Sequence, residues 1–161
     1  MPKKNDEIVR IDVPQEAFCI FCEEIRAEVN EKNTYIGVYS RQIYVDSFPY
    51  TLEKLSIALN VRWDMTAFPK SVSARLAYED KQDVMIPPMD PSEKIKVTED
   101  QEETVQLKAH IQCPPLEISK EGDIEVLVRM DNHFLSAGAL SIKKRPTKKL
   151  RKSKTPTKKS L

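Results

Sequence analysis

The strict alternation of apolar and polar residues in "LSIALNVRWDM", residues 55–65, constrains the fold more than any other feature of the chain. Side chains of a strand point to opposite faces in turn, whereas a helix needs apolar residues three and four apart. The stretch therefore predicts a half-buried strand. "VSARLAY", "VQLKAHIQC" and "IEVLVRM" alternate in the same way. The residues expected on the buried faces are Leu55, Ile57, Leu59, Val61, Trp63, Met65, Val72, Ala74, Leu76, Tyr78, Val105, Leu107, Ala109, Ile111, Cys113, Ile124, Val126, Val128 and Met130.

Turn-forming segments separate these stretches, among them "NEKN", "EDKQD" and "DNH". Prolines, including Pro87 and Pro88, are expected in connections, where a missing N–H costs no ladder bond. Several short strands without a long helical pattern predict an all-β protein, an antiparallel β-sandwich of immunoglobulin-like or C2-like type with seven or eight strands. We expect residues 17–142 to form this domain and residues 1–16 to be an N-terminal extension or an edge strand.

The charge of the chain is divided between a body and a C-terminal tail. The chain has 26 basic and 25 acidic residues, and residues 143–161 hold ten of the basic ones and no acidic one. The body therefore keeps 16 basic and 25 acidic residues, a net charge of −9. Low hydrophobicity with high net charge predicts a disordered tail. Its basic residues are Lys143, Lys144, Arg145, Lys148, Lys149, Arg151, Lys152, Lys154, Lys158 and Lys159.

The cysteines raise the question of a zinc site, because C-x-x-C pairs suit a tetrahedral ion. Cys19 and Cys22 form such a pair, and His110 with Cys113 would complete four ligands. In a strand, however, residues three apart point to opposite faces, so the two cysteines of the first pair diverge. His110 likewise falls on the polar face and Cys113 on the buried one. We favour cysteines that act as small core residues, with no metal and no other cofactor.

A catalytic site is not indicated by the sequence either. Three glycines in the whole chain are too few for a phosphate-binding loop, and His133 is expected in an exposed hairpin turn. Some sandwich domains gather carboxylates around calcium at strand ends, but acids scattered over loops are common, and we favour that interpretation. The calcium candidates are Asp64, Asp80, Asp83 and Asp131. Glu23, Glu24 and Glu28 could form an acid cluster, but we favour Glu23 and Glu24 as the end of a strand that leaves the core, with Arg26 as a partner. We predict that the protein is not an enzyme.

Several stretches in order resemble an uncharacterised family of bacterial and phage-associated β-sandwich proteins, known mainly as a domain of unknown function. They are "CEEIR" (22–26), "TYIGVYSRQIYV" (34–45), "SFPYTLEKLSIALNVRW" (47–63) and "PPLEISKEGDIEVLV" (114–128). The resemblance covers about residues 18–142 and leaves the basic tail outside. It implies the sandwich fold, and it brings no activity and no catalytic residues.

We therefore predict a non-enzymatic binding module whose basic tail contacts a polyanion, for which we favour a nucleic-acid backbone bound without sequence specificity. The alternative is a structural or protein-interaction sandwich, with a partner at a sheet edge such as "TYIGVYS" and a tail that serves only solubility or localisation. The charged N-terminal residues do not fit a signal peptide, and no apolar run reaches the roughly 20 residues that span a bilayer. We expect a cytoplasmic protein without a membrane or small-molecule partner.

Overall fold

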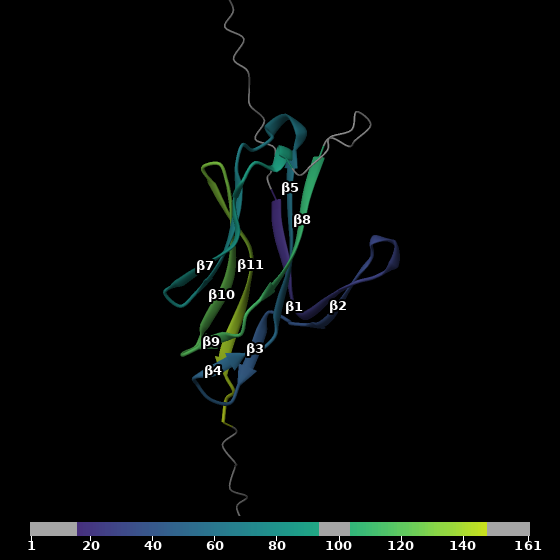
Figure 1. Ribbon diagram of the computed structural model, residues 1–161. Helices are drawn as coiled ribbons and strands as arrows, with labels where there is room; N and C mark the ends of the chain where they lie inside the picture. The colour runs from purple at the N-terminus through teal and green to yellow at the C-terminus, as the bar shows by residue number, and fades with distance from the viewer. Residues whose placement is uncertain (1–15, 94–103, 148–161) are drawn as a thin grey trace, which may run out of the picture.

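The computed structural model describes residues 16–93 and 104–147, and this part of the chain is all-β (Figure 1). Its eleven strands exceed the seven or eight expected. A four-stranded sheet has the order β2 (Asn33–Val38), β1 (Glu16–Ala27), β5 (Leu55–Asp64) and β8 (Thr104–Cys113). A five-stranded sheet has the order β3 (Gln42–Val45), β11 (His133–Lys144), β10 (Gly122–Met130), β6 (Val72–Tyr78) and β7 (Lys81–Met89).

A third, two-stranded sheet pairs β4 (Tyr50–Leu52) with β9 (Leu116–Ile118). Three short 3-10 turns complete the described elements: η1 (Val29–Glu31), η2 (Met65–Ala67) and η3 (Pro91–Glu93). The expectation of a purely antiparallel fold is wrong, because β3 runs parallel to β11. The sheets are thus antiparallel or mixed.

The two larger sheets face each other across a shared core. Figure 1 shows β7, β10 and β11 on one side of the molecule and β1, β5 and β8 on the other. A side chain added at Gly138 of β11 would place its Cβ 2.9 Å from the Cys19 Sγ of β1, so the two layers are in close contact there. Apolar residues of both sheets form one buried cluster, which includes Trp63, Leu76 and Leu140. Burial on this scale is the main stabilising term of such a fold.

The alternating stretches form β5, β6, β8 and β10, as predicted. Burial differs among them because their positions in the sheets differ. Every residue from Leu55 to Leu59 is buried in β5, which has neighbours on both sides, whereas the apolar side chains of the edge strand β8 are mostly half-buried. Met65 is not in the strand: Asp64 ends β5 by accepting a hydrogen bond from the Thr66 N–H (2.7 Å), which starts η2.

Pro87 and Pro88 also differ from expectation, since they lie inside β7 rather than in a connection. β7 is an edge strand of the five-stranded sheet. At an edge, a proline can turn its nitrogen, which has no hydrogen, toward solvent, so the hydrogen bonds to the neighbouring strand can still form. The physical rule behind the prediction therefore holds, but it applies to an edge as well as to a loop.

Candidate functional site

The structure places the first three basic residues of the predicted tail at one end of the five-stranded sheet. We call Lys143, Lys144 and Arg145 the tail root. β11 continues two residues past Ile142, so Lys143 and Lys144 belong to the sheet, where they pair with Tyr44 and Val45 of β3. The Arg145 N–H donates to the Val45 carbonyl at 2.7 Å. The other seven predicted contact residues, Lys148, Lys149, Arg151, Lys152, Lys154, Lys158 and Lys159, lie outside the described residues.

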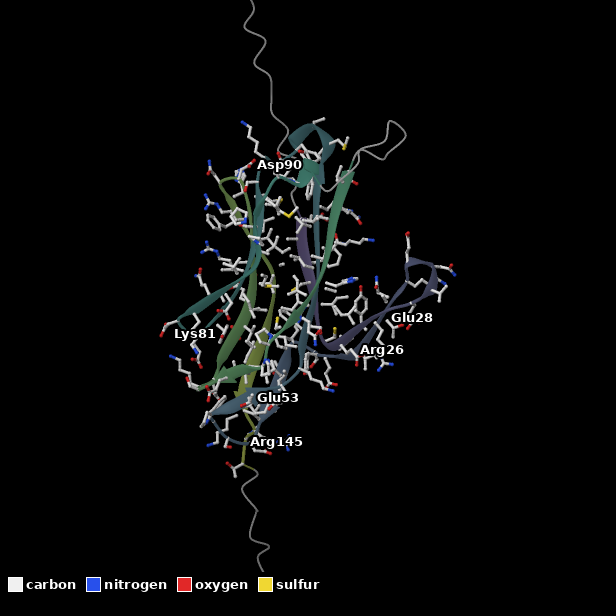
Figure 2. The ribbon with its side chains drawn as sticks, in the orientation of Figure 1. Arg26, Glu28, Glu53, Lys81, Asp90 and Arg145 are labelled. Carbon is white, nitrogen blue, oxygen red and sulfur yellow. The ribbon has the colours of Figure 1, made fainter. Side chains whose placement is uncertain are left out.

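All three residues of the tail root are exposed, and Lys144 and Arg145 each contact an acidic side chain. The backbone N–H of Lys144 donates to a carboxylate oxygen of Glu121 at 2.7 Å. The Arg145 Nε lies 3.5 Å from Asp46 Oδ1, in a pair whose side chains are both largely exposed. Exposed pairs of this kind contribute about 0–1 kcal/mol. The hydrogen bonds to β3 and Glu121, rather than the ion pair, therefore fix where residues beyond Arg145 leave the sheet. Figure 2 shows Arg145 at the opposite end of the molecule from Asp90.

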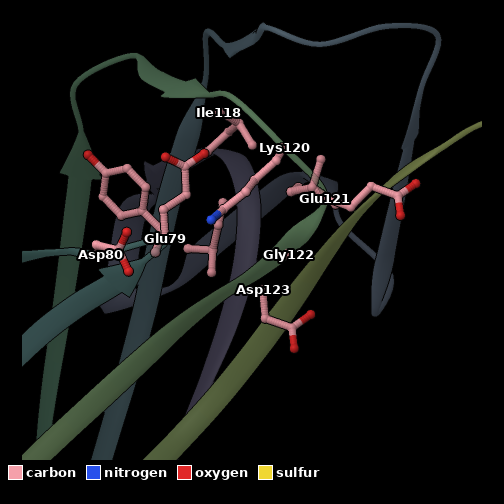
Figure 3. A pocket seen from close by; sticks show the side chains of 10 residues that line it. Glu79, Asp80, Ile118, Lys120, Glu121, Gly122 and Asp123 are labelled. Atoms are coloured by element: carbon pink, nitrogen blue, oxygen red, sulfur yellow. The ribbon is translucent and has the colours of Figure 1, made fainter.

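A pocket of about 260 Å³ lies beside the tail root, and Ile142 of β11 forms part of its wall. Figure 3 shows its charged lining: Glu79 and Asp80 follow β6, and Glu121 and Asp123 flank Gly122 at the start of β10. Lys120 is the single basic residue of this lining. We call the four carboxylates and the space between them the acidic pocket.

Three carboxylates of the acidic pocket are already engaged within the protein. Glu79 accepts hydrogen bonds from both the Oγ (2.7 Å) and the N–H (2.6 Å) of Ser119, and these bonds lower its pKa. Asp123 accepts a hydrogen bond from the Ser141 hydroxyl. Glu121 holds the Lys144 N–H, as described above. These carboxylates therefore connect neighbouring segments, and they make the surface beside the tail root negative.

The three cysteines among the candidate zinc ligands serve as packing residues. Cys19 faces Gly138 of the opposite sheet, and the buried Cys22 thiol donates to the Ser56 carbonyl at 3.6 Å. His110 is exposed, with its ring edge-on to Tyr35. Burial raises the pKa of Cys19 to about 12 and that of Cys113 to about 11, so both thiols stay protonated at neutral pH. Among the described residues, no three His, Cys, Asp or Glu side chains gather in a way that could hold a metal ion.

Four of the seven carboxylates considered for calcium or catalysis have a local partner instead. Asp64 caps η2, and Asp83 accepts from the Tyr78 hydroxyl at 3.1 Å. Asp131 Oδ1 accepts from the backbone N–H groups of Lys70 and Ser71, both at 3.0 Å. Glu24 pairs with Arg26 at 2.8 Å, and Asp80 lines the acidic pocket.

The proposed partner edge is present as β2, an outer strand of the four-stranded sheet. Tyr35 is 36 % exposed there, and the Tyr39 hydroxyl donates to the Lys54 carbonyl at 2.8 Å. Gly37 has a left-handed φ of +62°, and a Cβ at this position would lie 2.7 Å from the Glu23 side chain. The left-handed backbone favours glycine at this position, and the exposed Glu23 side chain would have to move to admit a Cβ.

A second, larger hollow lies at the other end of the five-stranded sheet, and the sequence reasoning missed it. It measures about 580 Å³, and we call it the basic groove. Arg75 of β6 and Arg129 of β10 each occupy a polar position of an alternating strand. This position is the signal in the sequence that the two side chains are exposed. Their proximity depends on the pairing of the two strands, which no local pattern shows. The full lining is Lys70, Ser71, Ser73, Arg75, Pro88, Arg129, Asp131 and Asn132.

Comparison with known proteins gives one match. The family described as "Family of unknown function (DUF6941)" matches residues 17–143 of the chain. The matched region starts within β1 and ends within the tail root, so it spans the elements that form both large sheets. No curated protein and no solved structure matches. In the part of the chain that the structure describes, no helix is long and apolar enough to cross a bilayer.

Proposed function

The chain belongs to DUF6941, a family of unknown function, and we propose that it is a non-enzymatic binding module whose basic residues 143–161 contact the phosphate backbone of a nucleic acid. The observation that carries the proposal is the division of charge, with ten basic and no acidic residues in this segment and a net charge of −9 in the rest. Basic side chains release the counterions condensed on phosphates, which favours binding at low salt.

The position of the tail root supports a role of the basic segment in binding. Lys143, Lys144 and Arg145 are exposed at one end of the sheet. The acidic pocket lies next to it, and its carboxylates repel phosphates. A polyanion would therefore contact the basic segment while the acidic end of the body stays at a distance. Residues 143–161 contain no aromatic residue, so base stacking by this segment is not expected.

The test is a binding titration of full-length protein with a labelled oligonucleotide at several salt concentrations. In the test variant, the seven basic residues beyond Thr147 become glutamine. The slope of log K against log salt should become shallower by about 0.7–0.9 for each phosphate that is no longer neutralised. A matched variant with the six lysines among them changed to arginine keeps the charge and should bind like wild type. Equal affinity and slope for wild type and the glutamine variant would exclude the proposal.

A structural or protein-interaction role is the second candidate, and the acidic pocket favours it. Four carboxylates lie beside the tail root, so the basic segment could be attracted to its own body and serve only solubility or localisation. A protein partner would then use the exposed edge of β2. In that case the glutamine variant would retain partner binding, and nuclease treatment would leave the complex intact.

We further infer that the fold is a β-sandwich, of immunoglobulin-like or C2-like type, supported by the two facing sheets and their common core. The three free cysteines support a reducing compartment such as the cytoplasm. A bacterial or phage source stays a prediction of the resemblance.

A further inference from the structure

The basic groove is held in shape by the turn between β10 and β11. Asp131, at a φ of +50°, binds the backbone N–H groups of Lys70 and Ser71 through one carboxylate oxygen. The Asp131 N–H in turn donates to the Ser71 carbonyl at 2.9 Å. These three hydrogen bonds fasten the turn to the segment that leads into β6. The groove is therefore a fixed feature of the sheet.

Three cations line the groove, against a single carboxylate. The Arg129 Nε donates to the Asp131 carbonyl at 2.8 Å, and one terminal nitrogen of Arg75 donates to Gln82 Oε1 at 3.3 Å. A guanidinium carries five N–H donors, so these bonds orient both groups and leave most of their donors for a ligand. Lys70 adds a third positive charge, and the carboxylate of Asp131 already accepts two backbone N–H groups. The local charge is thus positive on a body whose net charge is −9.

An exposed aromatic ring adjoins these cations. Phe134 is 68 % exposed, and the Arg129 guanidinium lies 5.3 Å from its ring centroid. Ser73, Arg129 and Phe134 are directly opposite one another on β6, β10 and β11. Adjacent strands lie about 4.8 Å apart, so the ring and the groove are separated by a distance that one nucleotide spans. An aromatic ring beside a cationic groove is the combination that binds single-stranded nucleic acids.

We propose that the basic groove is a second contact for single-stranded nucleic acid, in which Lys70, Arg75 and Arg129 bind phosphate and Phe134 stacks a base. An acidic peptide would use the same cations but has no need of a flat ring beside them. The groove lies at the opposite end of β10 from the acidic pocket and the tail root. The inference shares the class of ligand with the proposed function, and none of its residues belongs to the basic segment.

The experiment measures fluorescence anisotropy of a labelled oligothymidylate with full-length protein. The background is the glutamine variant of the seven basic residues beyond Thr147, so the groove is measured without their charges. Phe134→Ala should weaken binding about 5- to 150-fold, the range that corresponds to 1–3 kcal/mol for one stacked base. Arg75→Gln together with Arg129→Gln should also weaken it and should flatten the salt dependence.

Polyphosphate separates the two parts of the groove, because it offers phosphates without bases. In competition experiments, polyphosphate should bind the double variant Arg75→Gln, Arg129→Gln more weakly than the parent protein. It should bind Phe134→Ala as tightly as the parent protein. Phe134→Tyr retains a ring and should bind the oligonucleotide like the parent, whereas Phe134→Leu should bind like Phe134→Ala. This pair distinguishes loss of stacking from a general loss of fold.

Matched controls use the four-stranded sheet. Phe18 is also an exposed phenylalanine (53 %), and Lys108 is an exposed cation of β8. Phe18→Ala and Lys108→Gln should leave binding unchanged. Phe134→Ala that behaves like Phe18→Ala, or a DNA duplex that binds as tightly as the single strand, would overturn the inference. If instead the seven glutamine substitutions alone have no effect, the proposed role of the basic segment fails while the groove variants still test the groove.

Discussion

The two ends of the strand pair formed by β6 and β10 differ in both charge and use of hydrogen bonds. Asp123 and Arg129 lie six residues apart on β10, roughly 20 Å along an extended strand. At the first end, the carboxylates of the acidic pocket accept hydrogen bonds from Ser119, Ser141 and the Lys144 backbone. At the second end, Arg75 and Arg129 each use one guanidinium N–H for a hydrogen bond within the described part of the chain.

The carboxylates of the acidic pocket thus hold parts of the fold together, whereas the guanidinium groups of the basic groove keep N–H donors that a ligand could use. The net charge of the body, −9, averages over both ends and shows neither of them. A ligand that responds to the local field rather than to the net charge would meet an acidic surface at the acidic pocket, beside the tail root, and a basic one at the β10–β11 turn.

The largest expected effects are on stability, from core residues at the two ends of β10. Ile124 is buried and lines the acidic pocket, whereas Met130 is buried at the end near the basic groove. Met130→Ala should lower the free energy of unfolding by about 3–5 kcal/mol. Ile124→Ala should lower it by about 2–3 kcal/mol, because the space left by the Ile124 side chain adjoins an open pocket. Urea denaturation measures both. A larger loss for Ile124→Ala would contradict the view that the space left at Ile124 opens into the acidic pocket.

Asp131 should show the next largest effect, because one side chain fastens the basic end. Asp131→Ala removes the acceptor of two backbone N–H groups and places alanine at a φ of +50°. We expect a loss of about 1–3 kcal/mol. Asp131→Asn keeps an acceptor oxygen and tolerates the left-handed backbone, so it should stay within about 0.5 kcal/mol of wild type. If the alanine and asparagine variants unfold at the same urea concentration, the hydrogen bonds do not hold the turn.

Sequence reasoning predicts the strands that are long enough to show alternation, and it misses those that are too short or that contain prolines. β5, β6, β8 and β10 are long enough for a period of two to stand out. β3, β4 and β9 have only three or four residues each, so they show no period. β7 contains two prolines and alternates poorly, so its sequence alone favours a connection.

The candidate sites follow the same division. The basic segment is visible in the sequence because charge is a property of composition, although the structure assigns Lys143 and Lys144 to β11. The basic groove is not visible there, because Arg75 and Arg129 are 54 positions apart in the chain and meet only through the β6–β10 pairing. Pairing between distant strands depends on the whole core, and no local pattern specifies it.

A smaller effect should appear in the pH dependence of the acidic end. The Ser119 hydrogen bonds lower the pKa of Glu79, so its contribution to stability is present above its ordinary value of 4.5 and is lost as the pH falls through the lowered pKa. Wild type should therefore lose stability in acid relative to Glu79→Gln, in which the residue does not titrate. Melting temperatures between pH 3 and 7 give the comparison. If the difference in melting temperature between the two proteins is constant over that range, the strength of the Ser119 hydrogen bonds does not depend on the charge of Glu79.

The smallest effect concerns the ion pair at the tail root. Asp46→Asn removes the partner of Arg145 but leaves the hydrogen bond from the Arg145 N–H to the Val45 carbonyl intact. Because both side chains are largely exposed, the free energy of unfolding should change by about 0–0.5 kcal/mol. Raising the salt concentration should reduce even that difference. A loss well above this range would mean that the acidic surface, and not the pairing of β11 with β3, holds the tail root in place, and the contrast between the two ends would then have to include a binding role for the acidic one.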